Sequence, residues 1–212
     1  MKCSRFFLAI VLSFMLMACE GDGPTTYTPL TDENYALAES QIIFADYVSR
    51  AAQHTQTNGV GVLHHVREAA DPTDKTVVRI NFDTRYSFVV LDLTHDAIIT
   101  MPETGGRYQS LWFITEEHYN PMAINAPGVY TITQQAMGSR YVLAVIRTQV
   151  NMRDDADMQA VTQLQDAITV TQESRGEYVV TNKWNMDDVL AMRKKYQDIA
   201  VEKHISTAVM FG

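Results

Sequence analysis

Residues 85–93 read RYSFVVLDL, and this short stretch is the strongest evidence in the sequence for the fold class. Its β-branched and aromatic residues, bounded by turn residues, are typical of a β-strand. Five segments of the same kind accompany it, with no helix expected between them: Thr76–Ile80, Ala97–Met101, Arg107–Thr115, Val129–Thr133 and Arg140–Arg147. Because a parallel doubly wound sheet needs helices between its strands, we expect an antiparallel β-sandwich-like core.

Two closing strands and three helices are predicted outside this block. The strands are Ile168–Thr171 and Glu177–Thr181. The helices are Asp32 to His54, with Asp32 and Glu33 at its N-terminus, a second over 154–167, and a last one from Met186 to about Lys203. Val60 to Glu68 is ambiguous between strand and helix, and Glu116 to Pro127 is expected to form a long loop. The fold class is therefore α+β, mainly β.

The N-terminus has the pattern of an export signal. Lys2 and Arg5 precede the apolar run Phe6 to Ala18, which is too short for a comfortable transmembrane helix and suits a signal peptide. The run ends at Leu16-Met17-Ala18-Cys19, which resembles the bacterial lipobox, in which the cysteine is lipid-modified. The alternatives are an ordinary secretory signal or a chance cysteine.

The lipobox divides the chain into three predicted parts. Residues 1–18 form a lipoprotein signal peptide, residues 19–31 a flexible tether, and residues 32–212 a single domain. Cys19 is the expected lipid attachment site, so the partner is a membrane reached through the anchor. Glu20 after the cysteine, by its resemblance to enteric lipoproteins, implies the outer membrane and its periplasmic face within the cell envelope.

Composition excludes several classes of function. The chain has 212 residues, a formal net charge of −8 and only two cysteines. Nucleic-acid binding depends on clustered Lys and Arg, so we expect no nucleic-acid partner. Two cysteines cannot build a disulfide framework or a cysteine-based zinc site.

The polar stretch from Asn81 to Ser87 is the first candidate ligand site. On an extended chain, Asn81, Asp83, Arg85 and Ser87 would share one face, with Phe82, Thr84 and Tyr86 on the other. An amide, a carboxylate, a guanidinium and a hydroxyl on one face could hold a small polar ligand. From these residues alone, a turn satisfied by Asn81 and Asp83, with Asp83 paired to Arg85, is the simpler interpretation.

The other motifs give weaker evidence for a functional site. Pro102 to Tyr108 is interpreted as a hairpin-like turn, although its two glycines could let the backbone approach a ligand. His64 and His65 are adjacent, so in a strand they would face opposite ways and could not bind one metal. The sequence contains no Gly-x-Ser-x-Gly elbow, His-Glu-x-x-His, Walker loop or Rossmann fingerprint. We therefore expect no metal and no cofactor.

Taken together, several motifs resemble the bacterial domain-of-unknown-function 1254 family in order and spacing. They are Asn81-x-Asp83-Thr84-x-Tyr86-Ser87, Leu91-Asp92-Leu93, Pro102-x-Thr104-Gly105-Gly106-Arg107-Tyr108, Arg147-Thr148-x-Val150 and Leu164-Gln165-Asp166. The resemblance implies a β-sandwich-like domain with accompanying helices, often exported and often followed by a jelly-roll-like domain. It makes Asn81, Asp83, Thr84 and Tyr86 either a shared structural corner or a shared ligand site. The apolar ending Ile205 to Phe211 is unusual for a natural terminus, so we expect either a short member of this family or a chain that lacks a following segment.

Three hypotheses for function follow. The first is a lipid-anchored envelope protein whose β domain binds a small ligand or a partner protein without catalysis, with Asn81, Asp83, Thr84, Arg85, Tyr86 and Arg107 as candidate ligand-binding residues. The second is an envelope hydrolase or lyase that uses the polar residues of 81–87 with Arg107 or Arg147. A pocket where Asp83, Arg107 and a histidine converge would favour the enzyme. A third possibility is an inactive remnant of a longer protein.

Overall fold

A computed structural model describes residues 26–71, 73 and 81–205, in which twelve helices and strands are found. The helices are α1 (Tyr35–Thr55), α2 (Gln134–Met137), α3 (Asp155–Asp166) and α4 (Met186–Glu202). The strands are β1 (His64–His65), β2 (Thr84–Asp92), β3 (Ala97–Met101), β4 (Gln109–Thr115), β5 (Ala123–Ile124), β6 (Gly128–Ile132), β7 (Tyr141–Gln149) and β8 (Thr169–Gln172).

The strands form two antiparallel sheets. One sheet has the order β1-β2-β7-β4-β5 and the other the order β6-β3-β8. In the centre of the larger sheet, β2 and β7 pair along their full lengths, from Thr84 opposite Gln149 to Asp92 opposite Tyr141. The predicted α+β, mainly β class with an antiparallel, sandwich-like core is therefore confirmed, and the larger sheet does not close into a barrel.

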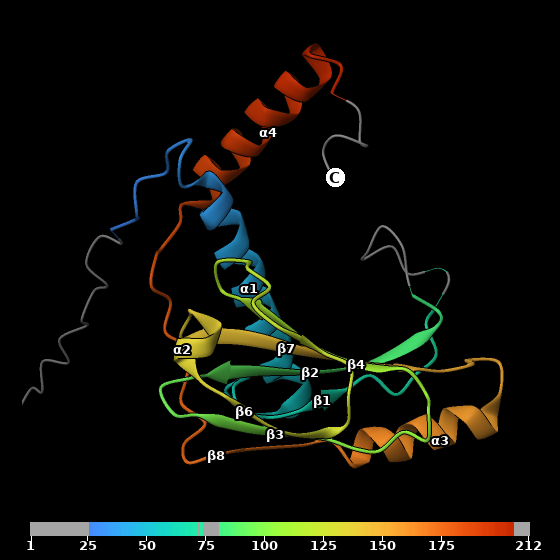
Figure 1. The fold of residues 1–212 in the computed structure, drawn as a ribbon. Coiled ribbons are helices and arrows are strands. Elements are labelled where there is room, and N and C mark those ends of the chain that lie inside the picture. The colour runs from blue at the N-terminus through green and yellow to red at the C-terminus, as the bar shows by residue number, and fades with distance from the viewer. Residues whose placement is uncertain (1–25, 72, 74–80, 206–212) are drawn as a thin grey trace, which may run out of the picture.

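The larger sheet lies between helix α1 and the smaller sheet (Figure 1). On one face, Phe44 and Val48 of α1 pack against Val90, Leu143 and Val145. On the other face, the side chains of the larger sheet pack against the smaller sheet in a core that includes Val89, Leu91, Leu111, Phe113, Ile99 and Ile132. Because both faces are covered, the central strands contain continuous apolar runs, over 88–91 in β2 and 141–146 in β7, instead of alternating with polar residues.

Helix α4 extends beyond both sheets and lies beside the N-terminal half of α1 (Figure 1). Tyr35 stacks on Tyr196 with 5.2 Å between the ring centroids, and Arg193 donates to Glu39 at 2.6 and 2.8 Å. Its start at Met186 agrees with the prediction, because the Asn185 side chain accepts a hydrogen bond from Asp187 N. No helix within the described ranges is long and apolar enough to cross a membrane.

Several predicted boundaries were wrong. Residues 177–181 form no strand, because Val179 N donates to the Tyr141 hydroxyl and not to a neighbouring strand. Helix α1 begins at Tyr35, and Asp32 lies in the turn before it and pairs with Lys195 of α4. The predicted loop 116–127 contains the short strand β5, and the ambiguous segment 60–68 contains β1. The predicted strand over 76–80 lies outside the described residues, as do Cys19 and the predicted signal peptide.

Candidate functional site

The Asn81–Asp83 segment is a turn that precedes β2. The Asn81 side-chain oxygen accepts hydrogen bonds from the backbone N–H groups of Asp83 at 2.8 Å and Thr84 at 3.2 Å. Its amide nitrogen donates to the Tyr86 hydroxyl at 3.3 Å. The simpler interpretation, a turn satisfied by Asn81, is therefore confirmed. The alternative, in which Asn81 and Asp83 share a strand face with Arg85 and Ser87, was wrong, because the chain bends before the strand begins at Thr84.

The other candidates of this stretch lie on opposite faces of β2. Thr84 is buried, and its hydroxyl oxygen has no hydrogen-bond partner in the described part of the chain. Tyr86 lies on the face covered by α1, where its ring stacks on Phe88 at 5.6 Å and the Arg147 guanidinium lies 5.8 Å from its centroid. Arg85 and Ser87 lie on the other face and are both buried.

Arg85 connects β2 to α3. Its guanidinium donates to Met158 O and to Thr162 Oγ1, both at 2.9 Å, and also to Arg67 O. The ion pairs among the described residues include none between Asp83 and Arg85, so the predicted pairing of those two was wrong. Burial lowers the pKa of Arg85, because the charged form loses solvation. Arg85 therefore holds the fold together and is not free to meet a ligand.

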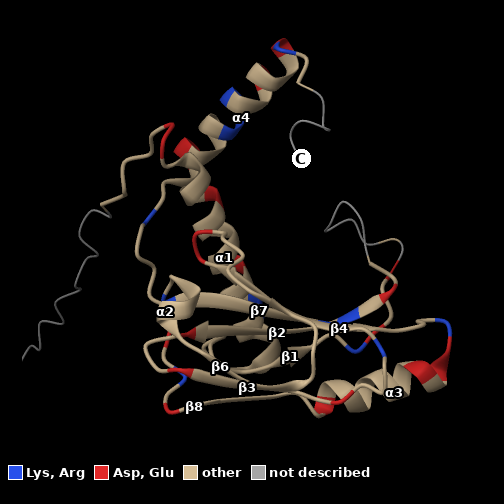
Figure 2. Cartoon of the chain, in the orientation of Figure 1, with Lys and Arg blue, Asp and Glu red and all other residues tan. Residues whose placement is uncertain are grey.

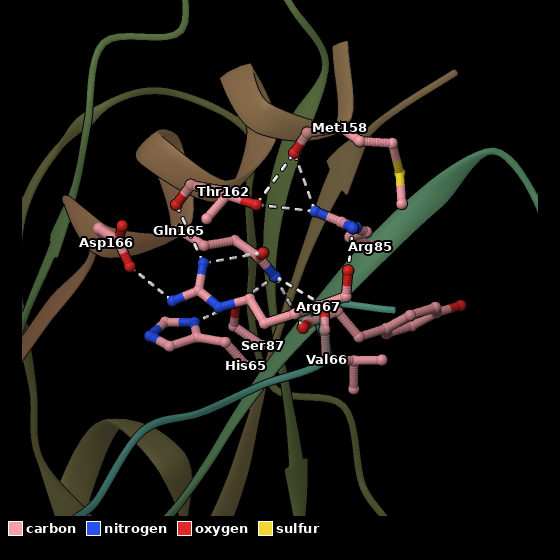
Figure 3. A network of polar contacts seen from close by, with 10 residues as sticks. His65, Val66, Arg67, Arg85, Ser87, Met158, Thr162, Gln165 and Asp166 are labelled. Atoms are coloured by element: carbon pink, nitrogen blue, oxygen red, sulfur yellow. Dashed lines mark hydrogen bonds and ion pairs between the residues drawn. The ribbon is translucent and has the colours of Figure 1, made fainter. Parts of the chain in front are cut away.

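Gln165 of α3 lies at the centre of a second set of buried contacts, drawn in Figure 3. Its side-chain oxygen accepts from Arg67 Nη1 at 3.2 Å. Arginine has donors only, so this contact identifies the oxygen and leaves the amide nitrogen as the donor to Tyr86 O at 3.0 Å and Ser87 Oγ at 3.2 Å. Arg67 also pairs with the Asp166 carboxylate at 2.5 Å.

These contacts determine the roles of Ser87 and His65. Since Ser87 Oγ accepts from Gln165, its hydroxyl proton is available to His65 Nδ1, which lies 2.7 Å away. Ser87 is 1% exposed, so the pair cannot act as a nucleophile and base on a substrate. His64 points the opposite way and stacks on His54 of α1 at 4.2 Å, which confirms that the two adjacent histidines face apart.

Stability should depend on pH through His65. Burial lowers its pKa to about 4 from the ordinary 6.5. Between these two pH values His65 is protonated in the unfolded chain but neutral in the folded protein. The free energy of unfolding should therefore fall as pH decreases from about 6.5 to about 4. Urea denaturation at pH 7, 6, 5 and 4 should show this fall in the free energy of unfolding. The variant His65→Asn keeps an acceptor for the Ser87 hydroxyl, and its free energy of unfolding should fall less over the same pH range. An unchanged pH dependence in the variant would contradict this role for His65.

Asp83 and Arg107, by contrast, do come together. They line an open pocket of about 330 Å³ with Gln149, Val150, Asn151 and Asp157. The pocket forms because Val150 N donates to Asp83 O at 2.9 Å after the end of β7, while Asn151 N donates to Asp157 Oδ2 at 2.7 Å in α3. Three segments that are distant in sequence therefore meet at one end of the larger sheet.

Arg107 is held in this pocket by Asp157. Its guanidinium donates to both carboxylate oxygens of Asp157, at 3.0 Å to Oδ2, and to Gln149 O at 2.8 Å. The hydrogen bonds from Arg107 lower the pKa of the Asp157 carboxyl and those to Asp157 raise the pKa of Arg107. Figure 2 shows that acidic residues gather at this N-terminal end of α3, where the helix dipole favours negative charge.

The side chains that line the pocket are mostly polar or charged. It brings together two carboxylates, a guanidinium and amides, and no histidine is among the described residues that line it. No group of three His, Cys, Asp or Glu side chains arranged to hold a metal ion occurs in the described part of the chain. Sequence reasoning missed Asp157, whose only signal was its place among the acids that open a predicted helix.

Comparison with known proteins gives a family but no activity. The chain matches the family model described as "Protein of unknown function (DUF1254)" over residues 60–172, more than half its length. No curated protein matches it significantly. One similar solved structure is the VPA0106 protein from Vibrio parahaemolyticus, with 18% sequence identity and a TM-score of 0.43. The match covers 72% of this chain and 42% of that protein, so this chain spans less than half of that protein's length. The chain belongs to the DUF1254 family of proteins of unknown function.

Proposed function

We propose that this protein is a lipid-anchored domain of the bacterial cell envelope that binds a small polar ligand without catalysis. The anchor rests on the leader and on Cys19, and Glu20 favours the outer membrane, with the domain on its periplasmic side. The binding role rests on the pocket around Asp83 and Arg107. Without the leader, which contains Lys2 and Arg5, the chain has 15 basic and 25 acidic side chains, a net charge of −10. This charge would repel the domain from anionic lipid, so the pocket would remain accessible at a distance from the membrane surface.

The convergence of Asp83, Arg107 and Asp157 is the observation that carries this proposal. Asp157 offsets the charge of Arg107, whereas the Asp83 carboxylate makes no ion pair or side-chain hydrogen bond with the rest of the described residues. Asp83 is exposed, so its carboxylate can accept hydrogen bonds from a ligand. A ligand with hydroxyl and ammonium donors, such as an amino alcohol or an amino sugar, complements that carboxylate.

The rival function, a hydrolase or lyase, has less support. It needs an acid, a base or a nucleophile within hydrogen-bond reach of one another. Arg85 and Ser87 are instead bonded to α3, and Arg147 lies over the Tyr86 ring on the opposite face of the sheet. The polar residues that sequence reasoning assigned to the enzyme are therefore divided between separate sites.

Thermal unfolding with and without ligand tests the binding role. A panel of amino alcohols and amino sugars should contain a compound that raises the unfolding temperature by roughly 3–5 °C at about ten times its Kd. Asp83→Asn should remove this stabilisation because it replaces the carboxylate with a neutral amide. Asp96→Asn is the matched control, since Asp96 is exposed in the turn at the far end of β2. Equal stabilisation of the Asp83 variant and the wild type would rule out this pocket as the site.

A further inference from the structure

A second cavity, of about 290 Å³, lies between α1 and the segment that leads into α4. We propose that it binds a small organic acid, with the carboxylate held by Gln41 and Lys183 and a flat apolar body held between aromatic side chains. This site is separate from the pocket of Asp83 and Arg107, and none of its residues lines both. Its walls are Tyr27, Tyr178 and Trp184, together with Ile42 and Ala45 of α1.

The orientation of Gln41 is determined by its neighbours. Its side-chain oxygen accepts from Trp184 Nε1 at 2.9 Å and from Asn182 Nδ2 at 3.1 Å. An indole nitrogen can only donate, so the atom opposite it must be the oxygen of the amide. The Gln41 amide nitrogen is therefore the group left over, and no acceptor within residues 26–71 and 81–205 receives a hydrogen bond from it.

Gln41 is also well buried. The residue is 6% exposed and lines the cavity. Its amide nitrogen is not among the fully buried side-chain atoms that lack a partner in the described residues, so this atom remains accessible from the cavity. A ligand oxygen placed in the cavity would supply the missing acceptor. Trp184 and Asn182 hold the amide in place, so binding would need no reorganisation of this side chain.

The aromatic side chains that line the cavity are also held in place by hydrogen bonds and ring contacts. The Tyr178 hydroxyl donates to the buried Glu116 carboxylate at 3.0 Å, and its ring contacts Tyr141 edge-on at 4.9 Å. Trp184 is fixed by its bond to Gln41. Thr28 N donates to Lys183 O at 2.7 Å and keeps the segment with Tyr27 beside the segment with Lys183. Rigid aromatic faces with few convergent polar groups are typical of small-molecule sites.

The charge at the cavity indicates the class of ligand. Lys183 lines it, and the ion pairs of the described residues do not involve this lysine. An unpaired ammonium and a free amide N–H both favour an anionic oxygen. A volume of about 290 Å³ accommodates a molecule of the size of an aryl carboxylate.

The experiment uses phenylacetate as the probe and its neutral analogue phenylacetamide as the reference. The readout is the NMR signal of the Trp184 indole N–H, with Trp112 on β4 as an internal control and Trp112→Phe used to assign the two signals. Phenylacetate should shift the Trp184 signal saturably and leave the Trp112 signal in place. Phenylacetamide should bind at least several-fold more weakly because it lacks the charge that Lys183 recognises.

Gln41→Glu is the decisive variant. It keeps an oxygen acceptor for Trp184 and Asn182 but replaces the free donor with a negative oxygen, so phenylacetate should bind at least tenfold more weakly. Gln53→Glu, an exposed position on α1 with the same change of charge, should bind as the wild type does. If Gln41→Glu fails to fold, Lys183→Gln should weaken the binding of phenylacetate several-fold and leave the binding of phenylacetamide unchanged. Unaltered binding in the folded variants, or no shift of Trp184 at all, would overturn the proposal.

Discussion

Replacing Arg85 with alanine is expected to lower the free energy of unfolding by about 3 kcal/mol, because charge-assisted hydrogen bonds contribute about 1.5–3 kcal/mol each and are not additive. Arg85 is 4% exposed and donates to Met158 O, Thr162 Oγ1 and Arg67 O. Its loss removes two hydrogen bonds between β2 and α3, leaving those from Gln165, and it deprives Arg67 O of its present donor. In a domain of this size the unfolding temperature should fall by roughly 6–12 °C.

Urea denaturation of matched variants measures this effect. Arg50→Ala is the control, because Arg50 is 60% exposed and pairs with Asp46 one helical turn away, a contact worth about 0.3–0.5 kcal/mol. Arg85→Lys should lie between the wild type and the alanine variant, since lysine keeps the charge but not the fork of donors. A midpoint for Arg85→Ala within error of the Arg50 variant would show that the Arg85 contacts contribute little to stability.

Replacing Cys19 with alanine is expected to release the protein from membranes completely. Each buried methylene of a lipid chain contributes about 0.8 kcal/mol to membrane binding, so several acyl chains make an anchor effectively permanent. Alanine has no thiol to accept a lipid. Membrane fractionation of cells expressing each form, together with metabolic labelling by a tagged fatty acid, should show the wild type labelled in the membrane fraction and the variant unlabelled in the soluble fraction.

Cys3→Ala is the matched control, because Cys3 is the other cysteine of the chain and lies inside the predicted leader. Its removal should leave labelling and membrane attachment unchanged. Persistent attachment of the Cys19 variant, or equal labelling of both variants, would contradict the lipoprotein prediction and with it the proposed location in the cell envelope.

Much of the fold could be predicted because the signals are local. The strands β2, β3 and β7 appear as apolar runs between turn residues, and β3 has the predicted ends. The N-terminal ends of α3 and α4 were predictable from Asp154 and Asn185, whose side chains accept hydrogen bonds from the first backbone N–H groups of each helix. The segment 177–181 failed because its composition is that of a strand, while its backbone bonds to the Tyr141 side chain.

The candidate site was less predictable, because nearness in sequence did not mean nearness in space. Asp83 and Arg107 were named as candidates and share a pocket, but Arg85 and Ser87 point away toward α3 and Tyr86 points toward α1. Gln41 was not noticed, because a glutamine within an amphipathic helix carries no signal of its own. Only its contacts with Trp184 and Asn182, more than 140 residues later, make it a candidate.

Composition, the alternation of side chains along strands and the capping residues alone determined a mainly β, antiparallel domain with helices outside the strand block, because those signals act over a few neighbouring residues. The tertiary structure decided which polar groups meet. Arg85 finds its acceptors 73 and 77 residues later, and Arg107 finds Asp157 50 residues later. Such partners depend on how β7 places α3 beside β2, and a hydrogen bond across that distance leaves no periodic mark in the chain.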